Sequence, residues 1–108
     1  MAQGFRQKLG LDFEDVYAPV AKQTIFRTLL AIASYKGIIL KHIDVKTAYL
    51  NGHLNEEVYM KQPPGFIAAG EETKVCRLRK SIYGLKQSAR CWNQTIELRL
   101  CEISNDFV

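Results

Sequence analysis

The sequence predicts an α+β fold in which helices pack on one face of a small antiparallel sheet. Apolar residues recur at helical spacing over residues 25–36 and again beyond Ser88, and short runs of branched residues lie between these two stretches. The chain has 108 residues and is 47% hydrophobic, so it can bury one modest core and is at most a single domain.

The first predicted helix covers roughly residues 25–36, after a mixed N-terminal stretch of loop or short extended structure that ends near Pro19. Thr24 is placed to cap the start of this helix, and Gly37 is placed to end it. The apolar residues that recur at helical spacing are Ile25, Leu29 and Ile32.

Three short strands are predicted between the helices. Residues 38–45 are rich in branched side chains and predict a buried strand. After a turn at Asn51-Gly52, residues 57–62 predict a second strand, which Pro63-Pro64-Gly65 ends. A surface loop then leads to a third strand over residues 74–78.

A second amphipathic helix is predicted beyond Ser88, which is placed as its cap. Its apolar stripe has polar residues between its members and consists of Trp92, Ile96, Leu100 and Ile103. The predicted order is therefore helix, strand, strand, strand, helix.

The cysteines and the N-terminus indicate where the chain resides. Cys76, Cys91 and Cys101 are odd in number and form no zinc-type pair, so we expect reduced thiols in an intracellular, cytoplasmic protein. The N-terminus lacks an apolar signal core, and no run has the length of a membrane span. We therefore predict a chain that is not secreted and has no membrane partner.

Positive charge is concentrated in one part of the chain, residues 74–99, which contain seven basic residues and a single acidic one, Glu97. Such a density attracts polyanions, and phosphate backbones are the commonest polyanion in a cell. The alternative is a solvated face, and charge alone favours that reading.

Asp44 is the strongest candidate for chemistry. It places one carboxylate at the end of the first predicted strand, with the aromatic ring of Tyr49 five positions on. Enzymes that join nucleotides hold two divalent ions between several carboxylates, and Mg²⁺ prefers oxygen ligands. An aspartate at a strand end is more often a turn or cap residue, so Asp44 alone carries little weight.

Two segments resemble motifs of the reverse transcriptase of Ty1/copia-type retrotransposons. Residues 44–52, Asp-Val-Lys-Thr-Ala-Tyr-Leu-Asn-Gly, are similar to the family block around the first catalytic aspartate, with Tyr49 in place of the commoner phenylalanine. Residues 81–92, Ser-Ile-Tyr-Gly-Leu-Lys-Gln-Ser-Ala-Arg-Cys-Trp, resemble a second block, with Ile82 for leucine and Ala89 where proline is common. Other blocks follow in family order over nearly the whole chain.

The resemblance implies roles within the first motif. Asp44 is implied as a catalytic residue and a ligand of Mg²⁺, with the carbonyl oxygen of Val45 as a further ligand. The ring of Tyr49 is implied to lie beneath the incoming sugar, where it would clash with a 2′-hydroxyl; core packing is the alternative. The backbone N–H groups implied to face the triphosphate are those of Lys46, Thr47 and Ala48.

In the second motif the resemblance implies contacts with nucleic acid. Gly84 would let the backbone approach template or nucleotide closely, because a side chain there would intrude. Lys86 and Arg90 would offer positive charge to phosphates. Trp92 is better explained as an anchor of the second helix in the core than as a base-stacking platform.

The family's Tyr-Val-Asp-Asp motif and its basic finger strand, Lys-Ala-Arg-Leu-Val-Ala, do not occur in the sequence. We therefore expect residues 1–108 to form an incomplete reverse transcriptase domain: part of the fingers and palm, without the N-terminal finger strands and the C-terminal Asp-Asp motif. With one such carboxylate, the two-ion Mg²⁺ site is expected to be incomplete and this chain alone inactive.

The implied parent enzyme is an RNA-directed DNA polymerase of a copia-type retrotransposon that works by two-metal nucleotidyl transfer. Its implied partners are an RNA template, a DNA primer, deoxynucleoside triphosphates and the rest of the Pol polyprotein, in a cytoplasmic virus-like particle. Two alternatives stay open. The chain is then either a small basic nucleic-acid-binding module or a non-functional transposon relic.

Overall fold

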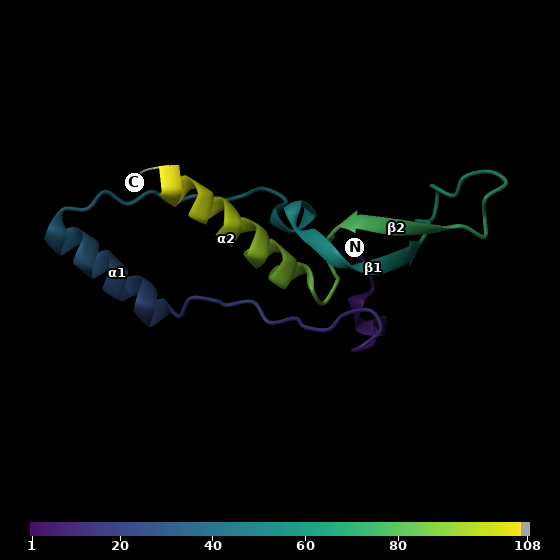
Figure 1. Ribbon diagram of the computed structural model, residues 1–108, viewed down its shortest axis with the longest axis horizontal. Helices are drawn as coiled ribbons and strands as arrows, with labels where there is room; N and C mark the ends of the chain where they lie inside the picture. The colour runs from purple at the N-terminus through teal and green to yellow at the C-terminus, as the bar shows by residue number, and fades with distance from the viewer. Residues whose placement is uncertain (107–108) are drawn as a thin grey trace.

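The computed structural model describes residues 1–106 and shows an elongated α+β chain (Figure 1). Its extents are 64 × 27 × 25 Å and its radius of gyration is 18.7 Å, against about 13 Å for a globular chain of this length. The elements in order are η1 (Gly4–Arg6), α1 (Gln23–Lys36), η2 (Ala48–Asn51), β1 (His53–Lys61), β2 (Val75–Lys80) and α2 (Ser88–Asp106), where η marks a 3₁₀ turn.

Strands β1 and β2 form an antiparallel hairpin, which confirms the antiparallel sheet and the strands predicted over 57–62 and 74–78. The pairing shifts between His53 and Val58, and Val58 is 7% exposed. The long connecting loop is fastened by Gln62. Its side-chain amide donates to the Glu71 carbonyl at 2.8 Å and accepts from the Ala68 N–H at 3.1 Å.

Helix α2 confirms the second predicted helix and packs against η2 and β1. Ser88 is its first residue, and its hydroxyl donates to the Ile82 carbonyl at 2.6 Å instead of capping the helix as predicted. The helix is well buried only near its start. Cys91 is 1% exposed, whereas Leu100 and Ile103, farther along the predicted stripe, are 54% and 52% exposed.

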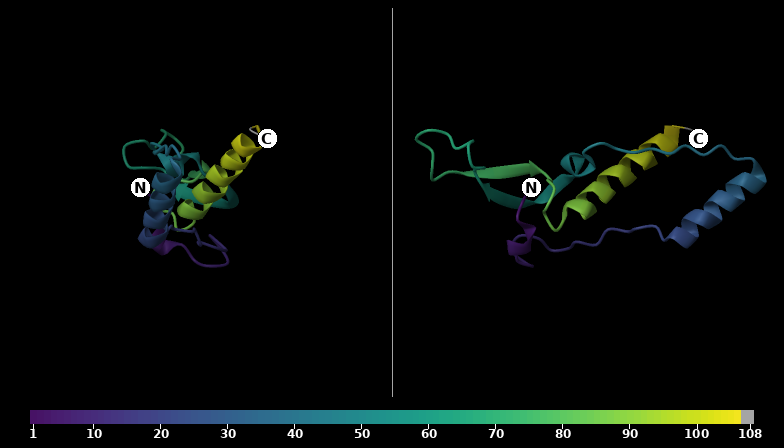
Figure 2. Two further views of the ribbon diagram at one scale, coloured as in Figure 1. Left: turned by 90° about the vertical axis from the view of Figure 1, so that its left-hand side faces the viewer. Right: turned by 180° about the vertical axis from the view of Figure 1, so that it is seen from behind.

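Helix α1 confirms the first predicted helix, extended at its start to Gln23. Gly37 ends it in the left-handed conformation (φ 67°), as expected, but the N-cap is Lys22 and not Thr24. The helix lies at the far end of the molecule from the hairpin, as Figures 1 and 2 show. The prediction that the helices share one face of the sheet is therefore wrong for α1, because its apolar side chains have no sheet to cover.

The predicted buried strand over residues 38–45 is also wrong. The segment has no strand structure, and Ile39 and Ile43 are 87% and 75% exposed. A strand needs a hydrogen-bonded neighbour, and within residues 1–106 the only sheet is the two-stranded hairpin. Asp44 therefore lies on an exposed, unpaired segment that leads into η2.

Residues 1–13 fold back onto the loop between β2 and α2, although the two are far apart in sequence. The N–H of Ala2 donates to the Tyr83 carbonyl at 2.8 Å. The backbones cross so closely that a Cβ atom on Gly4 would lie 1.9 Å from the Gly84 oxygen. Gly84 has φ 99°, so both the crossing and its backbone conformation require glycine there.

Candidate functional site

The two motifs found in the sequence lie side by side in the structure. The first motif ends in η2, which packs against the start of α2, and the second motif supplies the loop and first turns of that helix (Figure 1). The N–H of Ser81 donates to the Gly52 carbonyl at 2.9 Å. Thus the segment after Asp44 is fixed by the segment that carries Lys86 and Arg90.

Gly52 is the point of closest approach between the motifs. A Cβ atom there would lie 2.8 Å from the Ser81 hydroxyl, 3.0 Å from the Trp92 nitrogen and 3.1 Å from the Cys91 carbonyl carbon. Two of these atoms belong to the backbone of α2 and cannot move without moving the helix. The Asn51-Gly52 turn predicted from the sequence is therefore also a packing contact.

Tyr49 is held from two directions. The Ser81 hydroxyl donates to its backbone carbonyl, and its ring packs against the ring of Tyr83, with ring centroids 4.9 Å apart and planes inclined by 49°. Tyr49 is half-buried, whereas Tyr83 is 43% exposed. The pair presents an aromatic surface to solvent at the junction of the two motifs.

The backbone that leads to Tyr49 has an unusual conformation. Thr47 adopts the left-handed region with φ 54°, the only non-glycine residue with positive φ among residues 1–106. Its hydroxyl donates to the Lys46 carbonyl at 2.7 Å, and its own carbonyl accepts from the Asn51 side chain at 3.2 Å. A β-branched residue in this region is strained, so residues 46–48 are held in a specific shape.

Asp44 and Val45 precede this turn and are solvent-exposed. Neither lines the groove between the N-terminal segment and the hairpin or the smaller pocket beside α2. Among residues 1–106, no group of three or more His, Cys, Asp or Glu side chains is close enough to hold a metal ion. The residues present therefore do not fit a complete Mg²⁺ site, and Asp44 offers a single carboxylate.

Lys86 is engaged with the N-terminal segment. Its N–H donates to the Gln7 side chain at 2.8 Å, and its ammonium group donates to the Gln7 carbonyl at 3.1 Å. The ammonium group also lies 5.1 Å from the centre of the Phe13 ring. The Lys86 side chain remains exposed to solvent, but these contacts limit the positions that its ammonium group can reach.

Arg90 forms an ion pair with Glu56 of β1, and the two side chains are only 15% and 17% exposed. Arg90 Nε and Glu56 Oε2 are buried without hydrogen-bond partners in the described part of the chain. The predicted contact of Arg90 with phosphate remains a prediction. In this structure, the Arg90 guanidinium pairs with Glu56 and so links helix α2 to strand β1.

Burial around the start of α2 also affects Cys91. Desolvation raises the pKa of its thiol above the usual 9.0, and the nearby negative charge of Glu56 raises it further. The thiol therefore stays protonated near neutral pH. Trp92 beside it is half-buried, which is compatible with the predicted role as an anchor.

An open, largely apolar groove of about 660 Å³ runs between the N-terminal segment and the hairpin. The groove includes none of the predicted site residues. Its lining includes Arg6, Asp12, Val58, Met60, Leu78 and Leu85.

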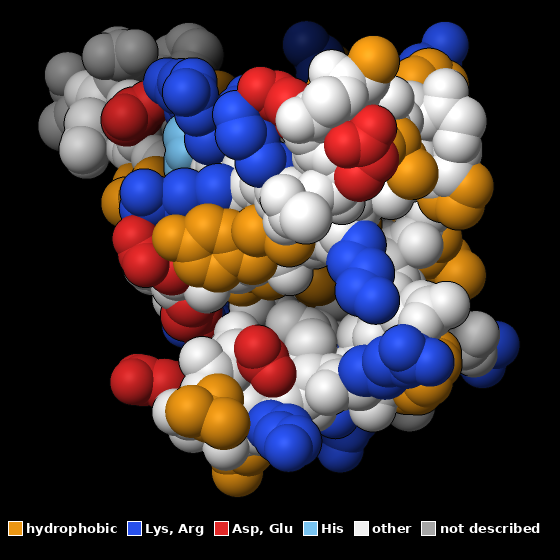
Figure 3. Space-filling model, turned by 90° about the vertical axis from the view of Figure 1, so that its right-hand side faces the viewer, with side chains coloured by type: hydrophobic (Ala, Val, Ile, Leu, Met, Phe, Trp, Pro, Cys, Tyr) orange, Lys and Arg blue, Asp and Glu red, His pale blue; other side chains and the backbone are white. Residues whose placement is uncertain are grey.

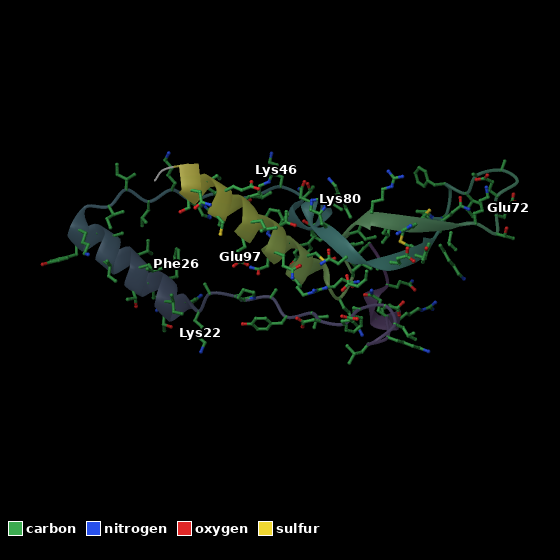
Figure 4. The ribbon with its side chains drawn as sticks, in the orientation of Figure 1. Lys22, Phe26, Lys46, Glu72, Lys80 and Glu97 are labelled. Atoms are coloured by element: carbon green, nitrogen blue, oxygen red, sulfur yellow. The ribbon has the colours of Figure 1, made fainter. Side chains whose placement is uncertain are left out.

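Charged side chains are mixed on the end of the molecule formed by the hairpin. Figure 3 shows Lys and Arg side chains spread over much of this face, with Asp and Glu side chains mainly toward its left and top. Figure 4 shows Lys46, on the segment before η2, and Lys80, at the end of β2, both in the neighbourhood of η2. Lys80 was not singled out from the sequence, since only the hairpin brings it there.

Sequence reasoning also missed Glu56, Ser81 and Tyr83 as parts of this region. Nothing in the local sequence pattern pairs Glu56 with Arg90, which lies 34 positions farther along the chain. Ser81 and Tyr83 belong to the second motif, so their position was visible. Their contact with Tyr49 depends on the long-range pairing of the two motifs.

Comparison with known proteins identifies relatives over the whole described chain. A family model described as "Reverse transcriptase (RNA-dependent DNA polymerase)" matches residues 1–106. The Pol polyprotein from transposon TNT 1-94 of Nicotiana tabacum is 49% identical over 92 residues, which are 85% of this chain and 7% of that protein. The Pol polyprotein from transposon RE2 of Arabidopsis thaliana is 44% identical over all 108 residues, again 7% of its length.

A more distant relative comes from yeast. The transposon Ty1-NL2 Gag-Pol polyprotein of Saccharomyces cerevisiae is 39% identical over 75 residues, which are 69% of this chain and 4% of that protein. No solved structure gives a significant match. In the described residues, neither helix has the length and apolar character needed to cross a membrane.

Proposed function

The chain belongs to the reverse transcriptase family of copia-type retrotransposon Pol polyproteins, and we propose that it is part of the fingers and palm of an RNA-directed DNA polymerase. That enzyme would extend a DNA primer with deoxynucleoside triphosphates on an RNA template. The chain spans about 7% of the length of its plant relatives. Its partner in this proposal is the rest of a Pol polyprotein.

The observation that carries the proposal is the meeting of the two motifs at η2. A nucleotide site needs a rigid frame, because misplacing a reacting group by 1 Å costs catalysis heavily. The Ser81 bonds to Tyr49 and Gly52 and the close contact of Gly52 with α2 supply such a frame. In our proposal the Tyr49 ring excludes the 2′-hydroxyl of ribonucleotides.

The same frame supports a role for residues 46–48. The strained turn at Thr47 fixes the direction of the following backbone N–H groups, and such groups bind anions when they face one another. We assign these N–H groups, with the exposed side chain of Lys46, to the triphosphate. Gly84 and Lys86 are assigned to template or primer.

The metal chemistry is assigned to the whole enzyme. Two bound Mg²⁺ ions supply Lewis-acid activation in polymerases of this kind. Asp44 is assigned one ligand position, with the Val45 carbonyl beside it. Because residues 1–106 contain no cluster able to hold a metal, this chain needs further carboxylates and is expected to be inactive alone.

Primer extension tests the proposal. The purified chain, with an RNA template, a DNA primer, deoxynucleotides and Mg²⁺ or Mn²⁺, is expected to leave the primer unextended. A chimera in which this chain replaces the matching segment of the TNT 1-94 reverse transcriptase is expected to extend it. Processive extension by the chain alone, or no extension by the chimera when the parent relative is active, would contradict the proposal.

The ion pairs argue against the alternative that the chain is a basic nucleic-acid-binding module. Four of the seven basic residues in the 74–99 stretch are paired with glutamates, which reduces the charge available to phosphates. Those four are Lys74, Arg77, Arg90 and Arg99. Tight, steeply salt-dependent binding of RNA or DNA by the isolated chain would restore this alternative.

A further inference from the structure

Tyr83 lies against the residue to which the proposed function assigns selection of the sugar. Its ring centroid is 4.9 Å from that of Tyr49, with the ring planes inclined by 49°. Pairs of this geometry are attractive beyond their burial of surface, so each ring limits the rotation of the other. Any ligand that pushes on Tyr49 from the opposite side is therefore resisted by Tyr83.

The backbone of Tyr83 is fixed more firmly than its exposure suggests. Its carbonyl accepts from the Ala2 N–H at 2.8 Å. The next residue, Gly84, lies so close to the backbones of Ala2 and Gly4 that no side chain would fit there. On the other side, Ser81 is fully buried and bonded to both Tyr49 and Gly52. Tyr83 thus has an anchored backbone and an exposed ring.

We infer that Tyr83 is a positioning residue for sugar selection: it supports the ring of Tyr49 so that the ring cannot retreat from a 2′-hydroxyl. This inference rests on the proposed function, because it needs Tyr49 to face the nucleotide. The substrate class concerned is the nucleoside triphosphate, and the property concerned is discrimination between deoxyribose and ribose. Tyr83 acts through Tyr49 and need not touch the sugar.

The test measures kcat/KM for dATP and for ATP in the chimera with TNT 1-94. Replacing Tyr83 with alanine is expected to lower the dATP to ATP preference roughly three- to tenfold, the range that one aromatic pair contributes. The change should come mainly from a lower KM for ATP, whereas a general loss of structure would lower kcat for both nucleotides. Tyr83→Phe keeps the ring and should preserve the preference.

Two further variants separate support from direct contact. Tyr49→Ala should lower the preference more than Tyr83→Ala, and adding Tyr83→Ala to Tyr49→Ala should change it no further, because no ring remains to be supported. Tyr59→Ala removes an exposed tyrosine of the hairpin and should leave the preference unchanged. An additional loss in the double variant, or an unchanged preference in Tyr83→Ala, would overturn the inference.

A measurement on the chain itself checks the contact independently of activity. Urea unfolding of the Tyr49→Ala, Tyr83→Ala and double variants should reveal a coupling between the two substitutions, and additive effects would show that the rings do not interact. If the unsubstituted chimera fails to extend primers while coupling is present, the proposed function is wrong. If the chimera is active and its sugar preference ignores Tyr83, only this inference is wrong.

Discussion

Glu56 of β1 and Arg90 of α2 form an ion pair in which each side chain is more than four-fifths shielded from solvent. One oxygen of Glu56 and one nitrogen of Arg90 are buried without a hydrogen-bond partner in the described residues. Charges withdrawn from water in this way are costly unless paired. The ion pair therefore links the hairpin to helix α2, and removing either side chain leaves the other charge unpaired.

Replacing one member of the Glu56–Arg90 ion pair should lower the free energy of unfolding. Glu56→Gln or Arg90→Met leaves the other charge shielded and unpaired, and we expect a loss of about 2–3 kcal/mol of unfolding free energy, toward the low end for a broken buried pair because some exposure remains. The double variant Glu56→Gln/Arg90→Met should lose less than the sum. Urea unfolding monitored by circular dichroism measures all three.

The Glu57–Arg77 pair is a matched control on the same hairpin, because both of its side chains are 61% exposed. Arg77→Met should cost less than about 1 kcal/mol. Equal losses at Arg77 and Arg90 would mean that shielding does not distinguish the two pairs.

Gly52→Ala should destabilise the junction of the two motifs. The added Cβ atom would meet the backbone of α2 at Cys91 and Trp92, so the helix must shift. We expect a loss of about 1–3 kcal/mol, as for overpacked sites. Gly52 has φ −70°, so alanine adds no backbone strain there; an unchanged unfolding free energy in Gly52→Ala would contradict the close contact.

Gln87→Leu should release the N-terminal segment. The Gln87 amide is fully buried, accepts from the Gln7 side chain at 2.9 Å and donates to the Asp12 carbonyl at 3.1 Å. Losing both hydrogen bonds is expected to cost about 1–3 kcal/mol, because the partly buried Gln7 amide and Asp12 carbonyl each lose a partner. Hydrogen exchange should rise at residues 1–13 and little in β1 or β2. Unchanged protection of residues 1–13 would show that the network does not hold them.

The cysteines should react in the order of their exposure. Cys101 is exposed and should be labelled first by a thiol reagent, whereas Cys91 is 1% exposed and its pKa is raised by burial. Because the reactive species is the thiolate, Cys91 should react only on unfolding. Mass spectrometry of partly labelled protein identifies the order, and early labelling of Cys91 would contradict the packing of α2.

The same raised pKa gives a pH dependence. The folded state binds the Cys91 proton more tightly than the unfolded state, so this contribution to stability is complete below about pH 9 and is lost as pH rises through the folded pKa. Compared with a Cys91→Ala variant, the wild-type chain should therefore lose unfolding free energy above pH 9. A difference between the two that does not vary with pH would show that burial does not perturb this thiol.

Local patterns predicted the local elements. The helical spacing over residues 25–36, Gly37 as its end and the proline break after β1 depend on neighbours in sequence and are confirmed. The buried strand over residues 38–45 failed because branched residues favour a strand only when another strand is available to pair with it. Its apolar side chains are accordingly exposed.

The candidate site likewise divides into residues found from local motifs and contacts that depend on the fold. Asp44 and Tyr49 were found from their motif, and their roles remain predictions. The ion pair of Arg90 with Glu56 and the hydrogen bond of Lys86 to Gln7 could not be predicted from the sequence. Each contact joins residues that are 34 or more positions apart, and only the folded backbone brings them together.

The most direct test of the account is the effect of Asp44→Asn on primer extension by the chimera with TNT 1-94. The substitution keeps the size of the side chain and removes the charge that a magnesium ligand needs, so extension should fall roughly a hundred- to a thousandfold, the scale for losing charge stabilisation at a reacting centre. Asp15→Asn, on an exposed loop, should leave extension unchanged. Extension by Asp44→Asn at the rate of the unsubstituted chimera would contradict the account.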